Sequence, residues 1–216
     1  MSDVHKKSIL LIIKGLLLRL LYAMCAIMLF AWCFNHSKQK GLARLTMKIA
    51  IIGCPGSGKS TVAKQLHEKL NIPLYHLDQY YWLPGWKRPD KNAFQKVHHA
   101  LCDQPEWLIE GMAMRNLAYR IAKADVVIFL DVPLWVCLYR IFRRACTGFG
   151  TIRDTSAPGC PERFPDREFL SYVWNFNSRH RPVIEQLLHQ YKDQKKIYVI
   201  KNSNEIENFI FDIPAK

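Results

Sequence analysis

The sequence contains no CxxC pair, although seven cysteines occur among its 216 residues. Their odd number and irregular spacing argue against the disulfide framework of a small secreted protein. Adjacent histidines such as His98 and His99 have no companion cysteine or carboxylate at metal-ligand spacing, which argues against a structural zinc site. Reduced and mostly buried thiols in a cytoplasmic protein account for the cysteines more simply.

Acidic residues are few, since 18 Asp and Glu stand against 31 Lys and Arg and leave a formal charge of +13. The excess is divided between residues 1–46, with +6, and residues 47–216, with +7. A basic chain suits nucleic acid, a membrane surface or polyanionic phosphates. The sequence has no helix-turn-helix, zinc-finger or basic aromatic pattern, so it argues against nucleic acid as the partner.

A long unbroken apolar run is also missing. The longest, Leu20–Phe34, has 15 residues, whereas a spanning helix needs about 20. Extension back to Ile9 gives 26 residues but includes Lys14 and Arg19, whose charges must reach one face of the bilayer. We therefore expect residues 9–34 to form an apolar helix that anchors the chain in a membrane or lies at its surface.

A phosphate-loop pattern is present at residues 53–60, where Gly-Cys-Pro-Gly-Ser-Gly-Lys-Ser fits G-x-x-x-x-G-K-[ST]. An apolar run, Lys48–Ile52, precedes the pattern, and a helix-periodic segment begins near Lys59. Glycine lets the backbone turn with positive φ and bring its N–H groups against phosphate. The N-terminus of the following helix adds its amides and positive dipole end. The sequence therefore predicts a nucleoside triphosphate site.

The residue types of this pattern have separate predicted roles. Lys59 reaches the β- and γ-phosphates as a point charge, and the Ser60 hydroxyl ligates Mg²⁺, with Thr61 as the weaker alternative for the metal. The predicted nucleotide-binding residues are Gly53, Cys54, Pro55, Gly56, Ser57, Gly58, Lys59, Ser60 and Thr61.

Two acidic residues follow predicted strands. Ile72–Leu77 is predicted as a short strand that ends at Asp78, and Trp107–Ile109 as a third strand that ends at Glu110. In α/β sheets, ligand-binding groups lie at the carboxyl ends of parallel strands. We expect Glu110 to orient Mg²⁺ through water and Asp78 to act as a base or to bind the acceptor. A surface-turn role for Asp78 stays open.

Arginines gather in the second half of the chain. Arg140, Arg143 and Arg144 lie within five residues on a predicted helix, and Arg115 lies in the loop after the third strand. Forked guanidinium groups suit phosphate, so we favour a phosphate-binding cluster over a solvated helix face. The turn-rich stretch 148–165 that follows the cluster is a predicted lid.

Apolar and helix-periodic segments alternate along the whole region. Further strands are predicted at Val126–Leu130 and Lys196–Ile200, and helices at Lys91–Cys102, Asn116–Lys123, Leu134–Thr147, Phe169–Tyr191 (bent or restarted at Pro182) and Glu205–Phe211. Gln79–Asp90 carries aromatic and basic residues around Pro84-Gly85, which suits either a substrate-binding lip or a loop that is merely packed. Five strand–helix alternations indicate an α/β fold whose parallel sheet is covered on both faces.

The region from Lys48 to Phe211 resembles the P-loop kinases that include adenylate and shikimate kinases. Within this group it is similar to small bacterial proteins labelled DNA topology modulation or adenylate-kinase-like proteins, through HLDQYYWLPGW (76–86), WLIEGM (107–112), ADVVIFLDVP (124–133), APGCPERF (157–164) and WNFNSRHRP (174–182). The resemblance implies a P-loop kinase-type three-layer sandwich, a five-stranded parallel sheet of order 2-3-1-4-5 and a helical lid at about residues 145–181.

The resemblance also implies roles for two arginines. The spacing from Pro133 to Arg140 and Arg144 agrees with the lid-hinge arginines of adenylate kinases, which would make Arg140 an adenine-stacking residue and Arg144 a phosphate contact. Two departures concern the acceptor. The family usually has Asp-Gly where this chain has Glu110-Gly111, and the nucleoside-monophosphate-binding segment of adenylate kinase is not recognisable.

Two functional hypotheses follow. The first is a Mg-ATP-dependent phosphotransferase acting on a small-molecule or nucleotide acceptor. The second is a nucleotide-gated regulatory NTPase that affects DNA topology. For the first, the expected catalytic residues are Lys59, Asp78, Arg115, Arg140 and Arg144, and the expected metal-binding residues are Ser60 and Glu110.

Residues 1–46 are predicted to be an extension outside the kinase-like domain, 47–216, and two interpretations besides a membrane contact stay open. In the first interpretation, the native chain starts at Met47, one residue before the first strand. In the second, the extension holds a cleaved signal. A signal lacks support because no small-residue cleavage site follows the apolar run. Export would also separate the domain from ATP, so we expect a cytoplasmic protein, with any anchor on the cytoplasmic face.

Overall fold

The computed structural model describes residues 46–212, and the unit Thr46–Lys216 is compact by itself. Residues 1–45 and 213–216 are outside the described range, and with them the apolar segment 9–34. Within residues 46–212, no helix combines the length and hydropathy that a membrane crossing requires. The interpretations of the N-terminal extension stay predictions.

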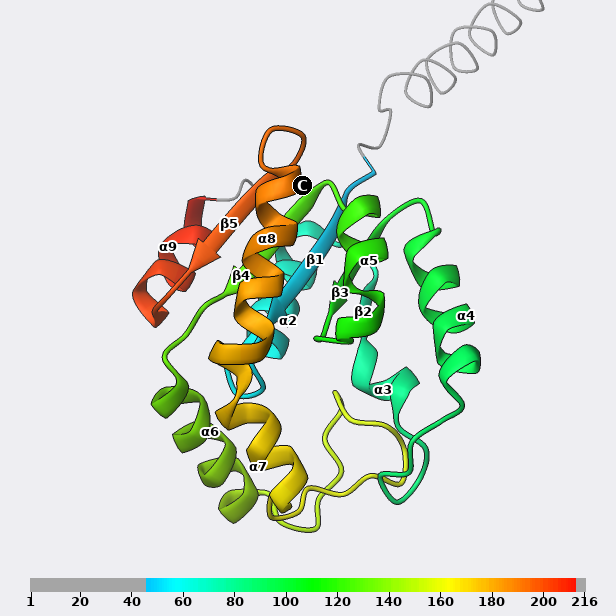
Figure 1. Cartoon of the computed structure of the whole chain (residues 1–216), viewed down its shortest axis with the longest axis vertical. Helices are drawn as coiled ribbons and strands as arrows, with labels where there is room; N and C mark the ends of the chain where they lie inside the picture. The colour runs from blue at the N-terminus through cyan, green and yellow to red at the C-terminus, as the bar shows by residue number, and fades with distance from the viewer. Residues whose placement is uncertain (1–45, 213–216) are drawn as a thin grey trace, which may run out of the picture. The chain divides into compact units, whose positions relative to one another are not determined.

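In this described range the chain forms a parallel sheet and the helices that connect its strands (Figure 1). The strands are β1 (Lys48–Gly53), β2 (Leu74–His76), β3 (Trp107–Glu110), β4 (Val126–Leu130) and β5 (Lys196–Ile200). The helices are α2 (Lys59–Leu70), α3 (Leu77–Tyr81), α4 (Lys91–Cys102), α5 (Leu117–Lys123), α6 (Leu134–Thr147), α7 (Arg167–Trp174), α8 (Arg181–Tyr191) and α9 (Ser203–Asp212), with a 3₁₀ turn η1 (Met114–Asn116) and a π-helical turn η2 (Phe176–His180).

The strands lie in the order β2-β3-β1-β4-β5, which confirms the order 2-3-1-4-5 that the resemblance implies. β1 is central and runs parallel to β3 on one side and β4 on the other. The register sets Ile51 beside Glu110 and Gly53 beside Leu130. The carboxyl ends of these strands therefore meet at one edge of the sheet, where the phosphate loop leaves β1.

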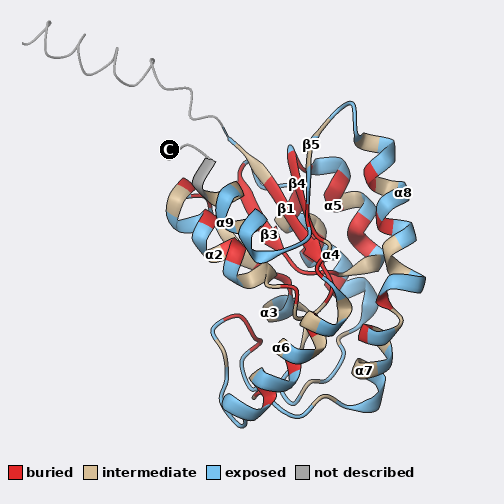
Figure 2. Ribbon diagram, turned by 90° about the vertical axis from the view of Figure 1, so that its left-hand side faces the viewer, coloured by how far each residue is buried: buried red, intermediate tan, exposed pale blue. Residues whose placement is uncertain are grey.

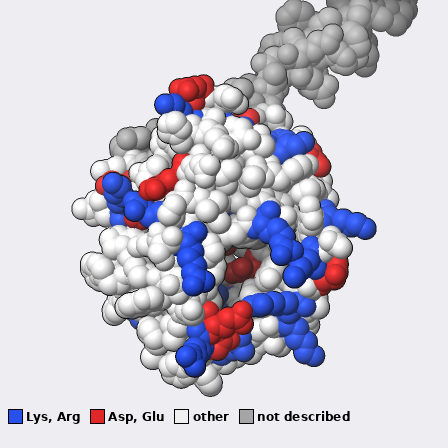
Figure 3. Space-filling view, in the orientation of Figure 1, with Lys and Arg blue, Asp and Glu red and all other residues white. Residues whose placement is uncertain are grey.

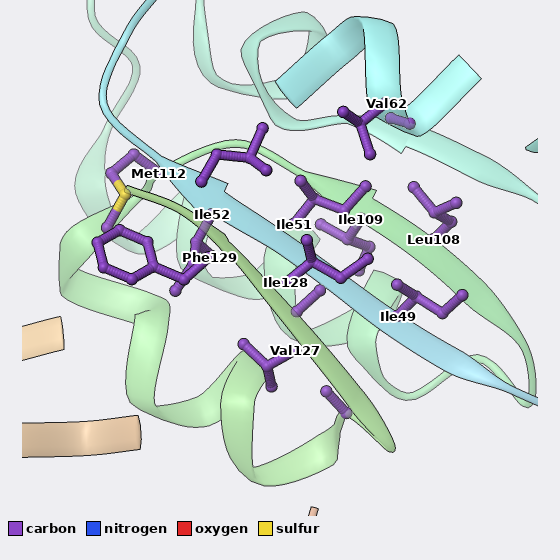
Figure 4. Packing of buried hydrophobic residues seen from close by; sticks show 14 of the residues in the cluster. Ile49, Ile51, Ile52, Val62, Leu108, Ile109, Met112, Val127, Ile128 and Phe129 are labelled. Atoms are coloured by element: carbon purple, nitrogen blue, oxygen red, sulfur yellow. The ribbon is translucent and has the colours of Figure 1, made fainter. Parts of the chain in front are cut away.

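Helices cover both faces of the sheet, as a parallel sheet requires. α2 and α9 lie on one face, and α5 and α8 on the other (Figure 1, Figure 2). Ile51, Ile109 and Ile128 have no exposed surface, and Val62 projects from α2 toward the strand side chains (Figure 4). Burial of each such side chain contributes about 1.5–3 kcal/mol. This core holds the strand ends, and hence the phosphate loop, in place.

Most predicted elements occur where the sequence placed them, and α4, α6, β4 and β5 agree to the residue. The strand predicted at Ile72–Leu77 is shorter, because β2 ends at His76 and α3 begins at once. Asp78 therefore lies in the first turn of α3 and not in a turn after a strand. A carboxylate is favoured in that first turn by the helix dipole.

The long helix predicted at Phe169–Tyr191 is divided into α7, η2 and α8. The break lies at Asn175, whose φ of −85° and ψ of 7° leave the helical region. The Asn175 side-chain amide donates to the Ser171 carbonyl oxygen at 2.8 Å, and such local bonds compete with a continuing helix. The restart predicted at Pro182 is confirmed, since α8 begins at Arg181 and Pro182 lies in its first turn, where proline is favoured. The earlier break at Asn175 was not predicted.

Candidate functional site

The phosphate loop lies tightly between β4 and α6. Gly53, Gly56 and Gly58 have positive φ values of 150°, 82° and 101°. A Cβ on Gly53 would lie 2.7 Å from the Leu130 carbonyl oxygen, and one on Gly56 would lie 2.5 Å from the Cys137 carbonyl oxygen. No side chain fits at these two positions, because the loop backbone packs directly against β4 and α6.

The polar groups of the loop are arranged as an anion site. Lys59 Nζ donates to the Cys54 carbonyl oxygen at 2.9 Å, within the loop itself. The Ser57 hydroxyl is buried, and no hydrogen-bond partner for it is found among residues 46–212. A buried hydroxyl without a partner is costly, so this group fits a ligand oxygen. Together with the N-terminus of α2, the loop suits the phosphates of a nucleoside triphosphate.

Ser60 and His76 meet at one carboxylate oxygen of Glu110. Ser60 Oγ donates to Glu110 Oε1 at 3.0 Å, and His76 Nδ1 lies 2.7 Å from the same atom. Burial alone would raise the pKa of Glu110, but the hydrogen bond from His76 and the charge of Lys59 outweigh it and hold this pKa below its ordinary value. Glu110 is therefore an anion at neutral pH.

The Ser60–Glu110 pair suits Mg²⁺ by its chemistry, because this ion prefers hydroxyl, carboxylate, phosphate and water oxygens. In the described part of the chain, no group of three or more His, Cys, Asp and Glu side chains is placed to hold a metal ion. An ion beside Ser60 would take most of its ligands from phosphate and water.

Asp78 is exposed, although protein atoms surround its carboxylate. This desolvation raises the pKa of Asp78, and the Glu110 charge raises it further, while the charges of Lys59, Arg153 and Arg144 oppose the shift. In the view of Figure 3 the surface has a hollow, with acidic atoms at its bottom and Lys and Arg side chains around its mouth.

The structure places the arginines of α6 at two different parts of the site. Arg140 Nη1 donates to the Ser57 carbonyl oxygen at 3.1 Å, and its Nη2 donates to Ser203 Oγ at 3.2 Å. Arg144 Nε donates to Glu162 Oε1 at 2.9 Å. Arg140 therefore lies at the phosphate loop, whereas Arg144 lies under the segment that follows α6.

Three residues of the predicted set are exposed and make no side-chain hydrogen bond to the groups above. Arg115 is exposed at η1, and its side chain makes no hydrogen bond or ion pair within the described part of the chain. Arg143 and Thr61 are also exposed. The catalytic role of Arg115 and the metal-binding alternative at Thr61 stay predictions.

Sequence reasoning missed His76, Glu162 and Arg153, an arginine in the segment after α6. Arg153 Nε donates to Glu162 Oε2 at 2.7 Å, so Glu162 joins Arg153 to Arg144. A glutamate in an arginine-bearing, turn-rich loop was the available signal for Glu162. For His76 the signal was its place at the predicted end of β2, one strand away from Glu110.

Arg120 was missed as well. This guanidinium is fully buried on α5 and donates from Nη2 to the carbonyl oxygens of Gly111 at 2.7 Å and Met112 at 3.1 Å. It has no acidic ion-pair partner among the described residues, and burial lowers the pKa of Arg120 to about 10. It fixes the backbone directly after Glu110. Its spacing of three from the buried Leu117, on the same helix face, was a signal that it points inward.

No family model matches the chain, and no curated protein matches its sequence. Solved structures do match. A shikimate kinase from Acinetobacter baumannii in complex with shikimate is 13% identical, with a TM-score of 0.50 over 77% of this chain and 90% of that one. A deoxyadenosine kinase from M. mycoides is 19% identical, with a TM-score of 0.43 over 76% and 97%. A sugar kinase from Janibacter sp. HTCC2649 is 14% identical, with a TM-score of 0.47 over 77% and 93%.

At these identities the similarity concerns the fold alone, and the match to the shikimate kinase carries that conclusion. The described unit has a P-loop kinase fold. The narrower resemblance to topology-modulation proteins stays a prediction.

Proposed function

We propose that this protein is a Mg-ATP-dependent phosphotransferase that passes the γ-phosphoryl group of ATP to a small-molecule or nucleotide acceptor. The observation that carries the proposal is the meeting of Lys59, the Ser60–Glu110 pair and Asp78 at the carboxyl edge of the sheet. Open α/β sheets bind their ligands at this edge. The P-loop kinase fold supports the same reaction class.

The phosphate loop binds the nucleotide in this proposal. Its amides and the Ser57 hydroxyl hold the phosphates, and Lys59 exchanges the Cys54 carbonyl oxygen for oxygens of the β- and γ-phosphates. Ser60 and Glu110 would hold Mg²⁺, which neutralises phosphate charge when bound. Arg140, next to the loop, supports the nucleotide side of the site.

Asp78 is the proposed base. Its raised pKa increases its affinity for a proton, and the best bases at neutral pH have a pKa near that value. Asp78 takes the proton of an acceptor hydroxyl as that oxygen bonds to the γ-phosphorus. The bond from this phosphorus to the β–γ bridging oxygen breaks, and ADP leaves with the bond electrons. The products are ADP, the phosphorylated acceptor and the proton on Asp78.

The regulatory NTPase hypothesis uses the same nucleotide site but needs no acceptor. ATP consumption by the full-length chain therefore separates the two, measured with and without Mg²⁺ against nucleoside monophosphates and small hydroxyl compounds. The proposal expects Mg²⁺-dependent ADP formation that rises with one acceptor class. Equal hydrolysis with and without every acceptor would favour the regulatory NTPase. Failure of the folded chain to bind Mg-ATP would overturn both.

A further inference from the structure

Glu162 joins Arg153, which lies in the lid with it, to Arg144 near the end of α6. Its side chain is 6% exposed, while those of Arg144 and Arg153 are 33% and 29% exposed. Each carboxylate oxygen accepts one Nε–H, from Arg144 at 2.9 Å and from Arg153 at 2.7 Å. Apart from one bond of Arg153 to Thr155, the terminal amino groups of both arginines have no hydrogen-bond partner in the described range. These groups are left available for an anion.

The lid backbone holds Glu162 in place. Its N–H donates to the Thr151 carbonyl oxygen at 2.7 Å, and its carbonyl oxygen accepts from Gly150 N–H at 2.9 Å. The preceding residue is fixed as well, because Trp86 Nε1 donates to the Pro161 carbonyl oxygen at 2.8 Å. Two further bonds fasten the lid to the same loop, from Gly85 N–H to the Gly159 carbonyl oxygen and from Cys160 Sγ to the Leu83 carbonyl oxygen.

Arg144 and Arg153, the two arginines that Glu162 joins, lie on the side of the site where the phosphates are expected. Arg140 and Arg144 are four residues apart on α6, so their side chains emerge on one helix face about 5–6 Å apart. Since Arg140 reaches the phosphate loop at Ser57, Arg144 follows one turn farther along. Lys59, Arg144 and Arg153 all act on the carboxylate of Asp78 as nearby positive charges. The pair held by Glu162 therefore lies within electrostatic reach of both Lys59 and the proposed base.

We propose that Glu162 is a positioning residue that holds Arg144 and Arg153 as a two-arginine clamp for the γ-phosphoryl group. This inference rests on the proposed function. Two guanidinium groups this close repel each other, and a buried carboxylate between them removes that repulsion before the nucleotide arrives. Because the clamp is formed in advance, phosphate binding does not have to order two long side chains.

The difference between ATP and ADP tests this directly, because only ATP carries the group that the clamp holds. Calorimetry on the full-length chain measures the affinity for Mg-ATP and for Mg-ADP in the wild type and in Glu162→Gln. The variant keeps the shape of the side chain and loses its charge. We expect its affinity for Mg-ATP to fall about tenfold or more, and that for Mg-ADP to change less than about twofold.

Glu168→Gln is the matched control. It removes another carboxylate from an arginine pair, with Arg88, but both side chains are exposed, and both affinities should stay at wild-type values. If Glu162→Gln does not fold, as judged by circular dichroism, Glu162→Asp replaces it: this shorter carboxylate keeps its charge but does not span both arginines.

Equal loss of Mg-ATP and Mg-ADP affinity, or no loss of either, would overturn the positioning role and leave the proposed function intact. A folded wild-type chain that binds neither nucleotide would remove the proposed function, and this inference with it.

Discussion

His76 and Glu110 are direct neighbours across two parallel strands. The register of β2 and β3 pairs them, and His76 Nδ1 lies 2.7 Å from Glu110 Oε1. Sheet pairing therefore fixes the contact more firmly than a loop would. The same carboxylate oxygen accepts from Ser60 on the first turn of α2. The buried His76–Glu110 pair therefore orients the carboxylate that we expect at the metal.

Glu110→Gln should weaken the response to Mg²⁺, because the amide removes the negative charge but keeps the size of the side chain. We expect the Mg²⁺ concentration for half-maximal ATP turnover to rise about tenfold or more. His76→Asn should produce a smaller rise, since the carboxylate stays and only its orientation is loosened. A Mg²⁺ titration at saturating ATP measures both. Unchanged Mg²⁺ dependence in Glu110→Gln would contradict the metal-binding role.

Lys59→Ala should abolish turnover and leave the fold intact. Among the described residues, the Lys59 ammonium has one hydrogen-bond acceptor, the Cys54 carbonyl oxygen, so its removal costs little packing. Lys64→Ala is the control, because Lys64 lies on the same helix but pairs with Asp154 on the surface. Activity and far-UV circular dichroism check the pair. An unfolded Lys59→Ala would show that this lysine supports the structure.

Arg140→Ala and Arg144→Ala should each lower kcat/KM by about 10²-fold, the usual cost of one charge-stabilising donor. Arg143→Ala is the matched control, because this arginine lies between them in sequence but is exposed. Its kinetics should stay near those of the wild type. If kcat/KM stayed near the wild-type value in all three variants, the cluster would be a solvated helix face.

Gly56→Ala should destabilise the protein more than Gly85→Ala. Both glycines have positive φ, 82° and 75°, so either alanine costs about 1–2 kcal/mol of backbone strain. A Cβ on Gly56 would also meet the Cys137 carbonyl oxygen at 2.5 Å, whereas one on Gly85 meets nothing within 4 Å. Urea unfolding compares the two. Equal loss of stability would show that the loop can move away from α6.

The fold was predictable because its signals are local. Apolar runs end at Gly53 and Glu110, and helix-periodic segments lie between them, so strand order followed once the family resemblance was stated. The helix break at Asn175 was missed because the sequence does not show whether an asparagine side chain will hydrogen-bond to the nearby backbone or point to solvent. Asp78 was placed near the site, but not on a helix, because three residues are too few for strand periodicity to define an end.

The site was predictable only where one motif contains it. Residues 53–61 are contiguous, so their chemistry can be read together. The bond of Glu162 to Arg144 spans 18 residues, and that of His76 to Glu110 spans 34. Such contacts depend on how the lid folds back and on strand register, which no local spacing specifies. Buried charges such as Arg120 are also hard to predict, because arginine is usually exposed.

Acid should destabilise the protein through His98. This imidazole is fully buried on α4, and Arg120 Nη1 lies 3.3 Å from its Nε2, so Nε2 accepts from the guanidinium and the ring is neutral. Burial, followed by the charge of Arg120, lowers the pKa of His98 to about 3, against about 6.5 in an unfolded chain.

Between these two values the unfolded state binds the proton and the folded state does not. The stability that the neutral ring contributes is therefore complete above about pH 6.5 and declines as the pH falls toward 3, by at most about 1.4 kcal/mol per pH unit. His98→Gln cannot take up that proton, so its free energy of unfolding should fall less steeply over this range, even if the variant is less stable at pH 7. Urea unfolding at pH 7.0, 6.0, 5.0 and 4.5 measures both slopes. Parallel curves for the two proteins would mean that His98 is protonated as easily in the folded state as in the unfolded one.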